Sequence, residues 1–216
     1  PTNVYFIRRY YPDVVFLHPK ANFFKLVEKG GLPTMQRRFC CEKLKENAGV
    51  GCVVLTGVRA EESRKRAEYN EVSVMSRRKE HKEHTHARTI EEIEENEHRC
   101  IKGKDKLMVF PLLKWTESDV WQFLREQGLP VNPCYEQSGR VGCMFCPFSS
   151  KKQIDYYEKQ YPKFKEHLLR SLGVFWERYE NHELENPEQL YDWWKSKQSL
   201  EVYKAKQAQT AINFDD

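Results

Sequence analysis

The chain has 216 residues, a length that fits one large domain or one domain with an appendage. Hydrophobic residues make up 39% of it and charged residues 31%, a globular composition in which no apolar run approaches the ~18 residues that span a bilayer. The net charge of +4 is too small to indicate a nucleic-acid-binding protein by itself.

The first third of the chain alternates helix and strand patterns. Apolar residues recur at helical spacing in some segments, whereas others are short continuous apolar runs, which are typical of buried parallel strands. Helices are expected over residues 3–11, from the capping residue Asn22 to Gly30 and Gly31, and over 37–46 and 61–69; buried strands are expected over 14–17 and 52–56. This alternation predicts an α/β fold with a doubly wound, mostly parallel sheet.

Residues 77–106 differ from the rest because charges of both signs dominate them. We interpret the segment as an exposed excursion, part helix and part loop. His81, His84 and His86 raise the alternative of a metal site, but no apolar scaffold nearby would fix the ligands, and a solvated polar segment is the favoured interpretation.

Regular patterns return after this excursion. A strand is expected over 107–112, and Thr116 to Asp119 resembles a capping box that opens a helix ended by Gly128. Beyond Ser150 we expect helices divided by Pro162, another near 187–197, and a loose tail over the last ten residues. We therefore expect an α/β domain over residues 1–150 and a helical extension over 151–216.

Cysteine carries the sharpest chemical signal. The seven cysteines are odd in number and no signal peptide precedes them, which argues for reduced thiols in a cytoplasmic protein and against a disulfide framework. Cys40 and Cys41 are adjacent, and Cys143 and Cys146 form a C-x-x-C pair followed by Pro147, as in ferredoxin-type cluster sites.

The spacing of the cysteines bears on what they bind. Two adjacent cysteines on a helix point about 100° apart, which suits the spread corners of a four-iron cubane better than a single ion. We favour a [4Fe–4S] cluster, with structural zinc and no metal at all left open as alternatives.

A second signal is the stretch Thr56 to Arg64, which follows a predicted strand and opens a predicted helix. Ligands bind at this edge of open α/β sheets, and Arg59 and Arg64 are placed to clamp an anion beside the helix N-terminus. The alternative is a solvated first turn in which these arginines pair with Glu61 and Glu62. Three more cations flank the cysteine pair and are candidates for the same site: Arg37, Arg38 and Lys43.

Four motifs in this order resemble the phosphoadenosine-phosphosulfate (PAPS) reductase family of the adenine-nucleotide α-hydrolase-like superfamily: RRFCCEKLKE, LTGVRAEESRKRA, FPLLKWTESDVWQFLREQGLPVNPCYE and GCMFCP. The resemblance covers about residues 1–150. It implies a doubly wound fold that binds an adenine nucleotide (ATP, adenylyl sulfate or PAPS), with substrate contacts from Arg59 and with Arg64 as a further candidate. It also implies a [4Fe–4S] cluster on four ligands: Cys40, Cys41, Cys143 and Cys146.

The sequence departs from this family in two ways. The Ser-Gly-Gly-x-Asp-Ser phosphate loop is missing and residue 1 is Pro, so we expect the first strand–loop–helix unit to be absent from this chain. The reductases use a nucleophilic cysteine near the C-terminus, but residues 147–216 contain none, and Cys52, Cys100 and Cys134 would require an unprecedented arrangement to replace it.

The absence of a C-terminal cysteine favours ATP- or adenylyl-dependent sulfur transfer over thiol-dependent reduction of adenylyl sulfate or PAPS. Reduction stays open, and so does a different class, a zinc-stabilised module that binds protein or nucleic acid without catalysis. The expected partners are an adenine nucleotide and a sulfur- or electron-donor protein. Two further matters are left open: a homo-oligomer, and a nucleic-acid acceptor on the lysines of the C-terminal helices, namely Lys151, Lys152, Lys163, Lys165, Lys195 and Lys197.

Overall fold

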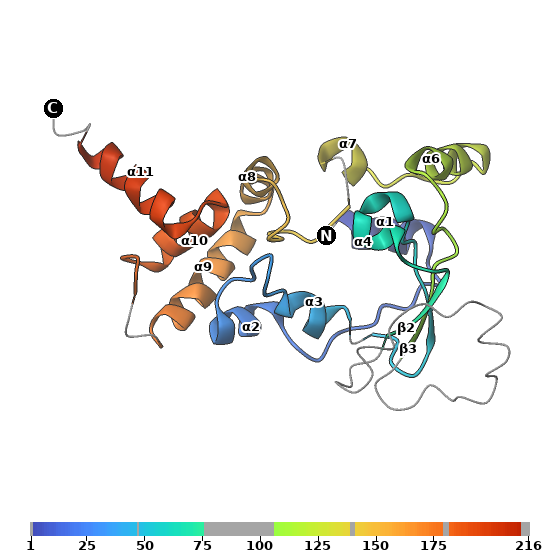
Figure 1. The fold of residues 1–216 in the computed structure, drawn as a ribbon, viewed down its shortest axis with the longest axis horizontal. Coiled ribbons are helices and arrows are strands. Elements are labelled where there is room, and N and C mark those ends of the chain that lie inside the picture. The colour runs from blue at the N-terminus through green and yellow to red at the C-terminus, as the bar shows by residue number, and fades with distance from the viewer. Residues whose placement is uncertain (1, 47, 76–105, 139–140, 179–181, 213–216) are drawn as a thin grey trace. The chain divides into compact units, whose positions relative to one another are not determined.

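A computed structural model describes residues 2–46, 48–75, 106–138, 141–178 and 182–212, which group into two compact units. Unit 1 comprises Asn3–Val14 and Asn47–Pro133, and unit 2 comprises Thr2, Val15–Glu46 and Cys134–Asp216 (Figure 1). The units therefore divide the chain differently from the expected domains over 1–150 and 151–216. The excursion before residue 106, with its three histidines, lies outside the described residues.

Unit 1 contains a small three-stranded sheet in the order β1-β3-β2, made of β1 (Val53–Leu55), β2 (Val72–Met75) and β3 (Lys106–Val109). β1 and β3 are parallel, whereas β2 is antiparallel to β3. The α/β class is thus observed at a coarse level, but the described strands form a small mixed sheet rather than a mostly parallel, doubly wound one.

The helical elements of unit 1 precede, separate or follow these strands along the chain. They are α1 (Thr2–Tyr10), the 3₁₀ turn η1 (Ala60–Glu62), α4 (Arg64–Ala67) and α6 (Glu117–Glu126). The capping box of α6 is confirmed, because Thr116 Oγ1 accepts from the Asp119 amide at 3.1 Å and Asp119 Oδ2 accepts from the Thr116 amide at 2.7 Å. The single helix expected over 61–69 is wrong, since Ser63 in extended conformation separates η1 from α4.

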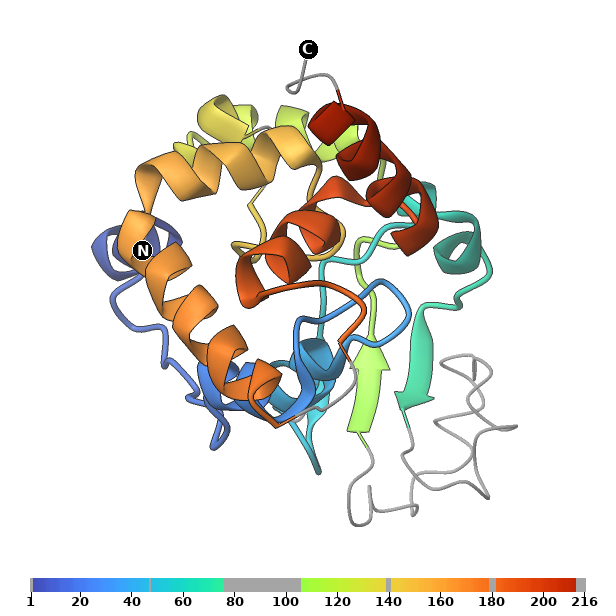
Figure 2. The same cartoon turned by 90° about the vertical axis from the view of Figure 1, so that its left-hand side faces the viewer.

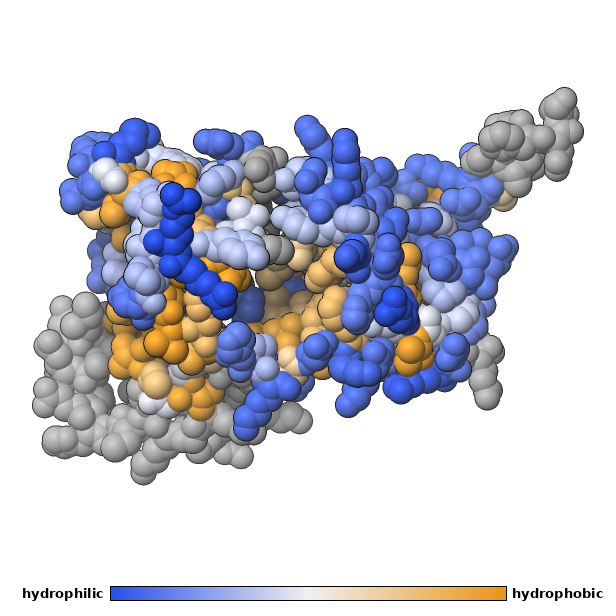
Figure 3. All heavy atoms as spheres, turned by 180° about the vertical axis from the view of Figure 1, so that it is seen from behind, coloured by the Kyte–Doolittle hydropathy of each residue, from blue (hydrophilic) through white to orange (hydrophobic). Residues whose placement is uncertain are grey.

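Two expectations of burial in the first third of the chain are also wrong. Residues 14–17 form no strand, and Val15 is 80% exposed. β1 is a strand as expected, but Val53 and Leu55 are 58% and 72% exposed, because no described element covers the face of the sheet on which both lie. Figure 3 shows apolar surface exposed on this unit. Continuous apolar runs signal burial only when neighbouring layers cover both faces of a sheet.

Unit 2 is helical. Its elements are α2 (Phe23–Gly30), α3 (Phe39–Leu44), α7 (Cys134–Ser138), α8 (Lys151–Gln160), α9 (Pro162–Trp176), α10 (Pro187–Ser196) and α11 (Leu200–Ile212). Asn22 caps α2 as expected, accepting from the Phe24 amide at 2.9 Å, and Pro162 separates α8 from α9. The loose tail is wrong up to Ile212, where α11 ends. Figure 2 looks onto these helices; α9 packs against α2, α8 and α10.

The largest described hydrophobic core lies in unit 2. Eight buried side chains form it: Val27, Phe145, Ile154, Tyr157, Leu168, Leu172, Tyr191 and Trp194. Helices α2, α8, α9 and α10 supply seven of them, and the eighth, Phe145, comes from the loop between Cys143 and Cys146. The core thus extends to the base of the C-x-x-C loop. Among the described residues, no helix is long and apolar enough to cross a membrane.

Candidate functional site

The adjacent cysteines lie on α3, as the sequence predicts. A tight turn leads into this helix, because the Arg37 amide donates to Thr34 Oγ1 at 3.0 Å and the Thr34 amide to the Arg37 carbonyl at 3.2 Å. The Arg38 carbonyl then accepts from the Cys41 amide at 3.0 Å, which begins the helical hydrogen bonding. Cys40 and Cys41 are therefore held by a turn and a short helix, and both are partly buried.

The second cysteine pair lies on a loop anchored by Phe145. This side chain is 2% exposed, and its ring stacks on Phe164 with centroids 5.2 Å apart and planes 6° apart. Its φ of 52° is in the left-handed region, which is uncommon for a large residue. The loop closes where the Ser149 amide donates to the Cys146 carbonyl at 2.9 Å. Burial of Phe145 thus fixes the backbone between the two cysteines.

The two cysteine segments belong to the same unit and interact. The Arg38 guanidinium lies 5.4 Å from the centroid of the Phe148 ring, two residues beyond Cys146. The pKa of the Cys40 thiol is raised to about 11, and burial is the largest cause. The neighbouring Cys41 and Cys143 thiols contribute to the increase. The two cysteine pairs thus belong to the same unit and influence each other electrostatically.

The donor set consists entirely of thiols, the soft ligands that suit an iron–sulfur cluster or zinc. Nevertheless, within the described part of the chain no three His, Cys, Asp or Glu side chains are grouped so as to hold a metal ion. The ligand chemistry therefore fits a thiolate-bound group, but the arrangement is not a ready-made site for one ion. Because the pKa of Cys40 is raised, thiolate ligands would form here only when a positively charged group binds and offsets their repulsion.

Two residues of the C-terminal helices border this cysteine site and were not singled out from the sequence for this role. Trp194 Nε1 donates to the Pro33 carbonyl at 2.7 Å, and Lys197 Nζ donates to the Pro147 carbonyl at 3.0 Å. Burial lowers the pKa of Lys197, and the nearby Cys146 opposes that shift in part. No sequence pattern carries these contacts, since each joins positions 50 or more residues apart.

The predicted anion loop lies in unit 1, after β1. The Thr56 amide donates to the Val109 carbonyl at 3.0 Å, and the Ala60 amide donates to the Leu113 carbonyl at 2.8 Å. The loop that carries Arg59 therefore runs beside the segment that follows β3, at the carboxyl ends of two parallel strands. Thr56 Oγ1 is buried, and the described residues offer it no hydrogen-bond partner.

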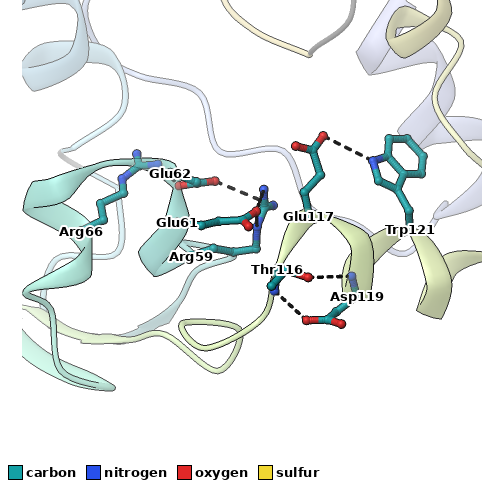
Figure 4. A network of polar contacts seen from close by, with 8 residues as sticks. All are labelled: Arg59, Glu61, Glu62, Arg66, Thr116, Glu117, Asp119 and Trp121. Carbon is teal, nitrogen blue, oxygen red and sulfur yellow. Dashed lines mark hydrogen bonds and ion pairs between the residues drawn. The ribbon is translucent and has the colours of Figure 1, made fainter.

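In this structure the Arg59 guanidinium is paired with carboxylates. Its nitrogens lie 3.1 Å from a Glu61 oxygen and 3.9 Å from a Glu62 oxygen, and Glu62 also pairs with Arg66 (Figure 4). This is the solvated-turn arrangement that the sequence left open. Arg64 lies exposed on α4, whose four residues are too few to provide the expected helix dipole. Anion binding here would require Arg59 to exchange these carboxylates for the ligand.

The remaining predicted cations belong to unit 2. Arg37 lies 5.9 Å from the Phe39 ring centroid, and Lys43 pairs with Glu42 at 2.8 Å. The five predicted anion contacts are thus split between the units, with Arg59 and Arg64 in one and Arg37, Arg38 and Lys43 in the other. Cys134 lies on α7 of unit 2 and Cys52 is exposed in unit 1, whereas Cys100 falls outside the described residues.

An α/β unit with a loop at the carboxyl ends of two parallel strands, together with a helical unit that carries two pairs of cysteines, defines the protein as an α/β protein with a cysteine-rich helical unit. Residues 33–149, more than half of the chain, match the family described as phosphoadenosine phosphosulfate reductase domain, and the chain belongs to this family. The matched segment includes the anion loop and all four cysteines of the two pairs.

Several curated proteins are similar to parts of the chain. Sulfate adenylyltransferase subunit 2 of Maricaulis maris is 39% identical over 49 residues, which is 23% of this chain and 16% of that protein. The same subunit of Geotalea uraniireducens is 30% identical over 80 residues, 35% of this chain and 26% of that protein. An uncharacterized protein of Methanocaldococcus jannaschii is 23% identical over 164 residues, 73% of this chain and 34% of that protein. The chain thus spans about a third or less of these relatives.

Proposed function

We propose that the protein acts in nucleotide-dependent sulfur chemistry as a [4Fe–4S] protein, and that it transfers sulfur rather than reducing a sulfonate. The observation that carries this proposal is that both cysteine pairs of a PAPS-reductase-family chain belong to one unit, where Arg38, two residues before Cys40, lies 5.4 Å from the ring centroid of Phe148, two residues after Cys146. Cys146, three residues after Cys143, completes the ligand set. When bound, a cluster held by all four thiolates would have no open iron; it would join the two cysteine segments and could exchange electrons.

Arg59 is the residue that we propose for nucleotide phosphate binding. It lies at the carboxyl end of β1, and its present partners Glu61 and Glu62 are flexible carboxylates that a polyphosphate could replace. In the proposed reaction an acceptor oxygen attacks the α-phosphorus of ATP and pyrophosphate leaves. A thiocarboxylate of a donor protein then displaces AMP through its sulfur, and hydrolysis of the acyl–sulfur bond releases the donor as a carboxylate, so that sulfur replaces oxygen on the acceptor.

Transfer is preferred over reduction because residues 147–216 offer no thiol to take up a sulfonate. We do not narrow the acceptor to one class of molecule. Three of the six lysines considered for nucleic-acid binding, Lys151, Lys165 and Lys195, form ion pairs with Asp155 or Glu158, which weakens the case for a continuous basic track there.

A second candidate function comes from the relatives named sulfate adenylyltransferase subunit 2. On that reading the protein would be one subunit of an assembly that activates an acceptor with ATP, and the cysteines would be structural. Both readings require the anion loop. They differ in whether the thiols carry iron and sulfide, or only stabilise the fold with zinc.

The deciding measurement is the metal and sulfide content of anaerobically purified protein, followed by assays with adenylyl sulfate or PAPS plus thioredoxin. We expect about four iron and four sulfide per chain, loss of both in Cys143→Ser, and full retention in Cys52→Ser. Stoichiometric zinc without sulfide would overturn the cluster. Rapid sulfite release would overturn the preference for transfer over reduction.

A further inference from the structure

The C-terminal end of α10 contacts the main chain beside both cysteine segments. Trp194 Nε1 reaches the carbonyl of Pro33, a fully buried residue that precedes the turn into α3. Lys197, directly after α10, reaches the carbonyl of Pro147, the residue after Cys146. One short stretch of four residues is therefore hydrogen-bonded to the chain seven residues before Cys40 and one residue after Cys146.

The conformation of Lys197 supports a specific role for its side chain. Its φ of 61° and ψ of 17° place it in the left-handed region, where Gly would be the less strained residue. Its Nζ lies 4.2 Å from the centroid of the Trp194 indole, so the two side chains pack on each other. A Gly at this position would fit the backbone but could not contact Pro147.

The neighbouring tryptophan shows that these contacts are not general to α10. Trp193 Nε1 donates to the Gln198 carbonyl at 3.1 Å, which is a local contact between α10 and the segment that follows it. No described hydrogen bond of the Trp193 side chain reaches a cysteine segment. Trp193 is thus a matched control for Trp194, with the same residue type, helix and kind of hydrogen bond.

We propose that Trp194 and Lys197 are positioning residues for the four-cysteine site. By holding the main chain at Pro33 and Pro147, they set the separation between the Cys40–Cys41 pair and the Cys143–Cys146 pair, and Lys197 adds a positive charge beside Cys146. The family match ends at residue 149, so α10 lies outside the matched segment. The nature of the bound group rests on the proposed function, whereas the spacing of the thiols does not.

The spacing is tested on the metal-free 216-residue chain with Cys52, Cys100 and Cys134 replaced by Ser. A bifunctional reagent that bridges thiols only a few ångströms apart is added, and bridged peptides joining the two pairs are measured by mass spectrometry. We expect Trp194→Phe and Lys197→Gly each to bridge about fivefold more slowly than the parent, because each loses one hydrogen bond that holds a cysteine segment. Trp193→Phe should match the parent, and Lys197→Arg, which keeps a donor, should restore most of the rate.

Folding is controlled within the same series. Lys197→Gly relieves the left-handed backbone while it removes the amine, so circular dichroism and melting should show an intact fold. If Trp194→Phe unfolds, Lys197→Gly and Lys197→Arg still decide the matter. Parent-like bridging in folded Lys197→Gly and Trp194→Phe overturns the proposal.

A second readout tests the charge and separates the two proposals. In protein reconstituted with iron and sulfide, Lys197→Gly should lower the midpoint potential, because the added electron loses a nearby positive charge, whereas Lys197→Arg and Trp194→Phe should not. An unshifted potential in Lys197→Gly overturns the electrostatic part. A parent that binds no iron overturns the proposed cluster alone, because the bridging experiment needs no metal.

Discussion

Phe145 is the residue on which the C-x-x-C loop depends most directly. Its ring is buried in the core of unit 2 and stacks on Phe164, and in the sequence it lies between Cys143 and Cys146. Phe145→Ala should lower the free energy of unfolding by about 3 kcal/mol, the cost of emptying a large core position. Urea denaturation followed by tryptophan fluorescence measures this.

Phe148, three residues further along the same loop, is the control for that substitution. It is half exposed and contacts the Arg38 guanidinium, so Phe148→Ala should cost less than about 1 kcal/mol. Equal losses in the two variants would contradict the view that Phe145, and not Phe148, anchors the loop in the core.

Arg59 leads to a prediction about ligand affinity. Because Glu61 competes for the guanidinium, Glu61→Gln should tighten binding of ATP or tripolyphosphate about threefold, within the range of a surface ion pair. Arg59→Ala should weaken binding about tenfold, since a charge-assisted contact is lost. Isothermal titration calorimetry gives both values.

Glu68 serves as the matched acidic residue for this comparison, because it follows α4 and belongs to no described ion pair of the Arg59 network. Glu68→Gln should leave the affinity unchanged. If Arg59→Ala binds the polyphosphate as the parent does, the anion loop is not the nucleotide site.

At the scale of elements, an ionic network joins α8 and α10 and includes α9. Lys195 on α10 pairs with Asp155 and Glu158 on α8, and Lys165 on α9 reaches Glu158. Burial raises the pKa of Glu158, but hydrogen bonds from Lys195, Lys165 and Tyr191 outweigh it, so the pKa lies below its usual value. Hydrogen bonds from Lys195 and Lys151 likewise lower the pKa of Asp155.

The sign of the pH dependence follows from these depressed pKa values. The unfolded carboxyls titrate near pH 4, so the network contributes its full stability above that pH and loses it as the pH falls through the lower folded values. We expect the free energy of unfolding to be constant from about pH 7 to 5 and to fall below about pH 4.

Lys195→Met should flatten this acid dependence, because Glu158 and Asp155 lose the partner that depresses their pKa values. Lys204→Met, which breaks an exposed pair between α11 and Glu183 in the segment before α10, should leave it unchanged. Urea unfolding at a series of pH values compares the two. An identical acid profile in Lys195→Met and the parent would show that the network does not couple to folding.

How well individual elements can be predicted depends on whether their signals are local. The caps of α2 and α6 and the break at Pro162 are local and appear where the sequence places them. By contrast, α11 has few buried positions, Tyr203 among them. Its sequence therefore lacks the apolar stripe from which a helix could be predicted. The strand predicted over 14–17 is wrong for the opposite reason. Its apolar pattern indicates a strand that pairs with a neighbour, and the described residues provide no such partner strand.

The same distinction applies to the candidate site. The two cysteine pairs and the anion loop are short motifs, and the sequence alone identifies their residues. What holds them is not local. Phe145 reaches the core, and Trp194 and Lys197 reach carbonyls of segments distant in the chain, so only tertiary packing reveals these roles.

At the scale of the whole molecule, the units are discontinuous in sequence. Unit 2 is assembled from residues 15–46 and 134–216, so the segment before the cysteine pair and the segment around the C-x-x-C loop join the same helices. Sequence reasoning that divides a chain at one boundary, here at residue 150, has no means of finding such an arrangement. Contacts across roughly a hundred residues decide it.

The bare edge of β1 has a consequence for how the protein behaves in solution. Val53 and Leu55 present apolar side chains beside main-chain groups that no strand of the described residues pairs with on that side. Such an edge is a template for any other strand, and crowded preparations of the 216-residue chain should associate reversibly as concentration rises. Leu55→Lys should suppress this association in sedimentation velocity runs, whereas Val202→Lys, on an equally apolar but helical position, should not. Every measurement proposed above would then report on a monomer only in dilute solution, or in the Leu55→Lys variant, whose β1 edge carries a charge.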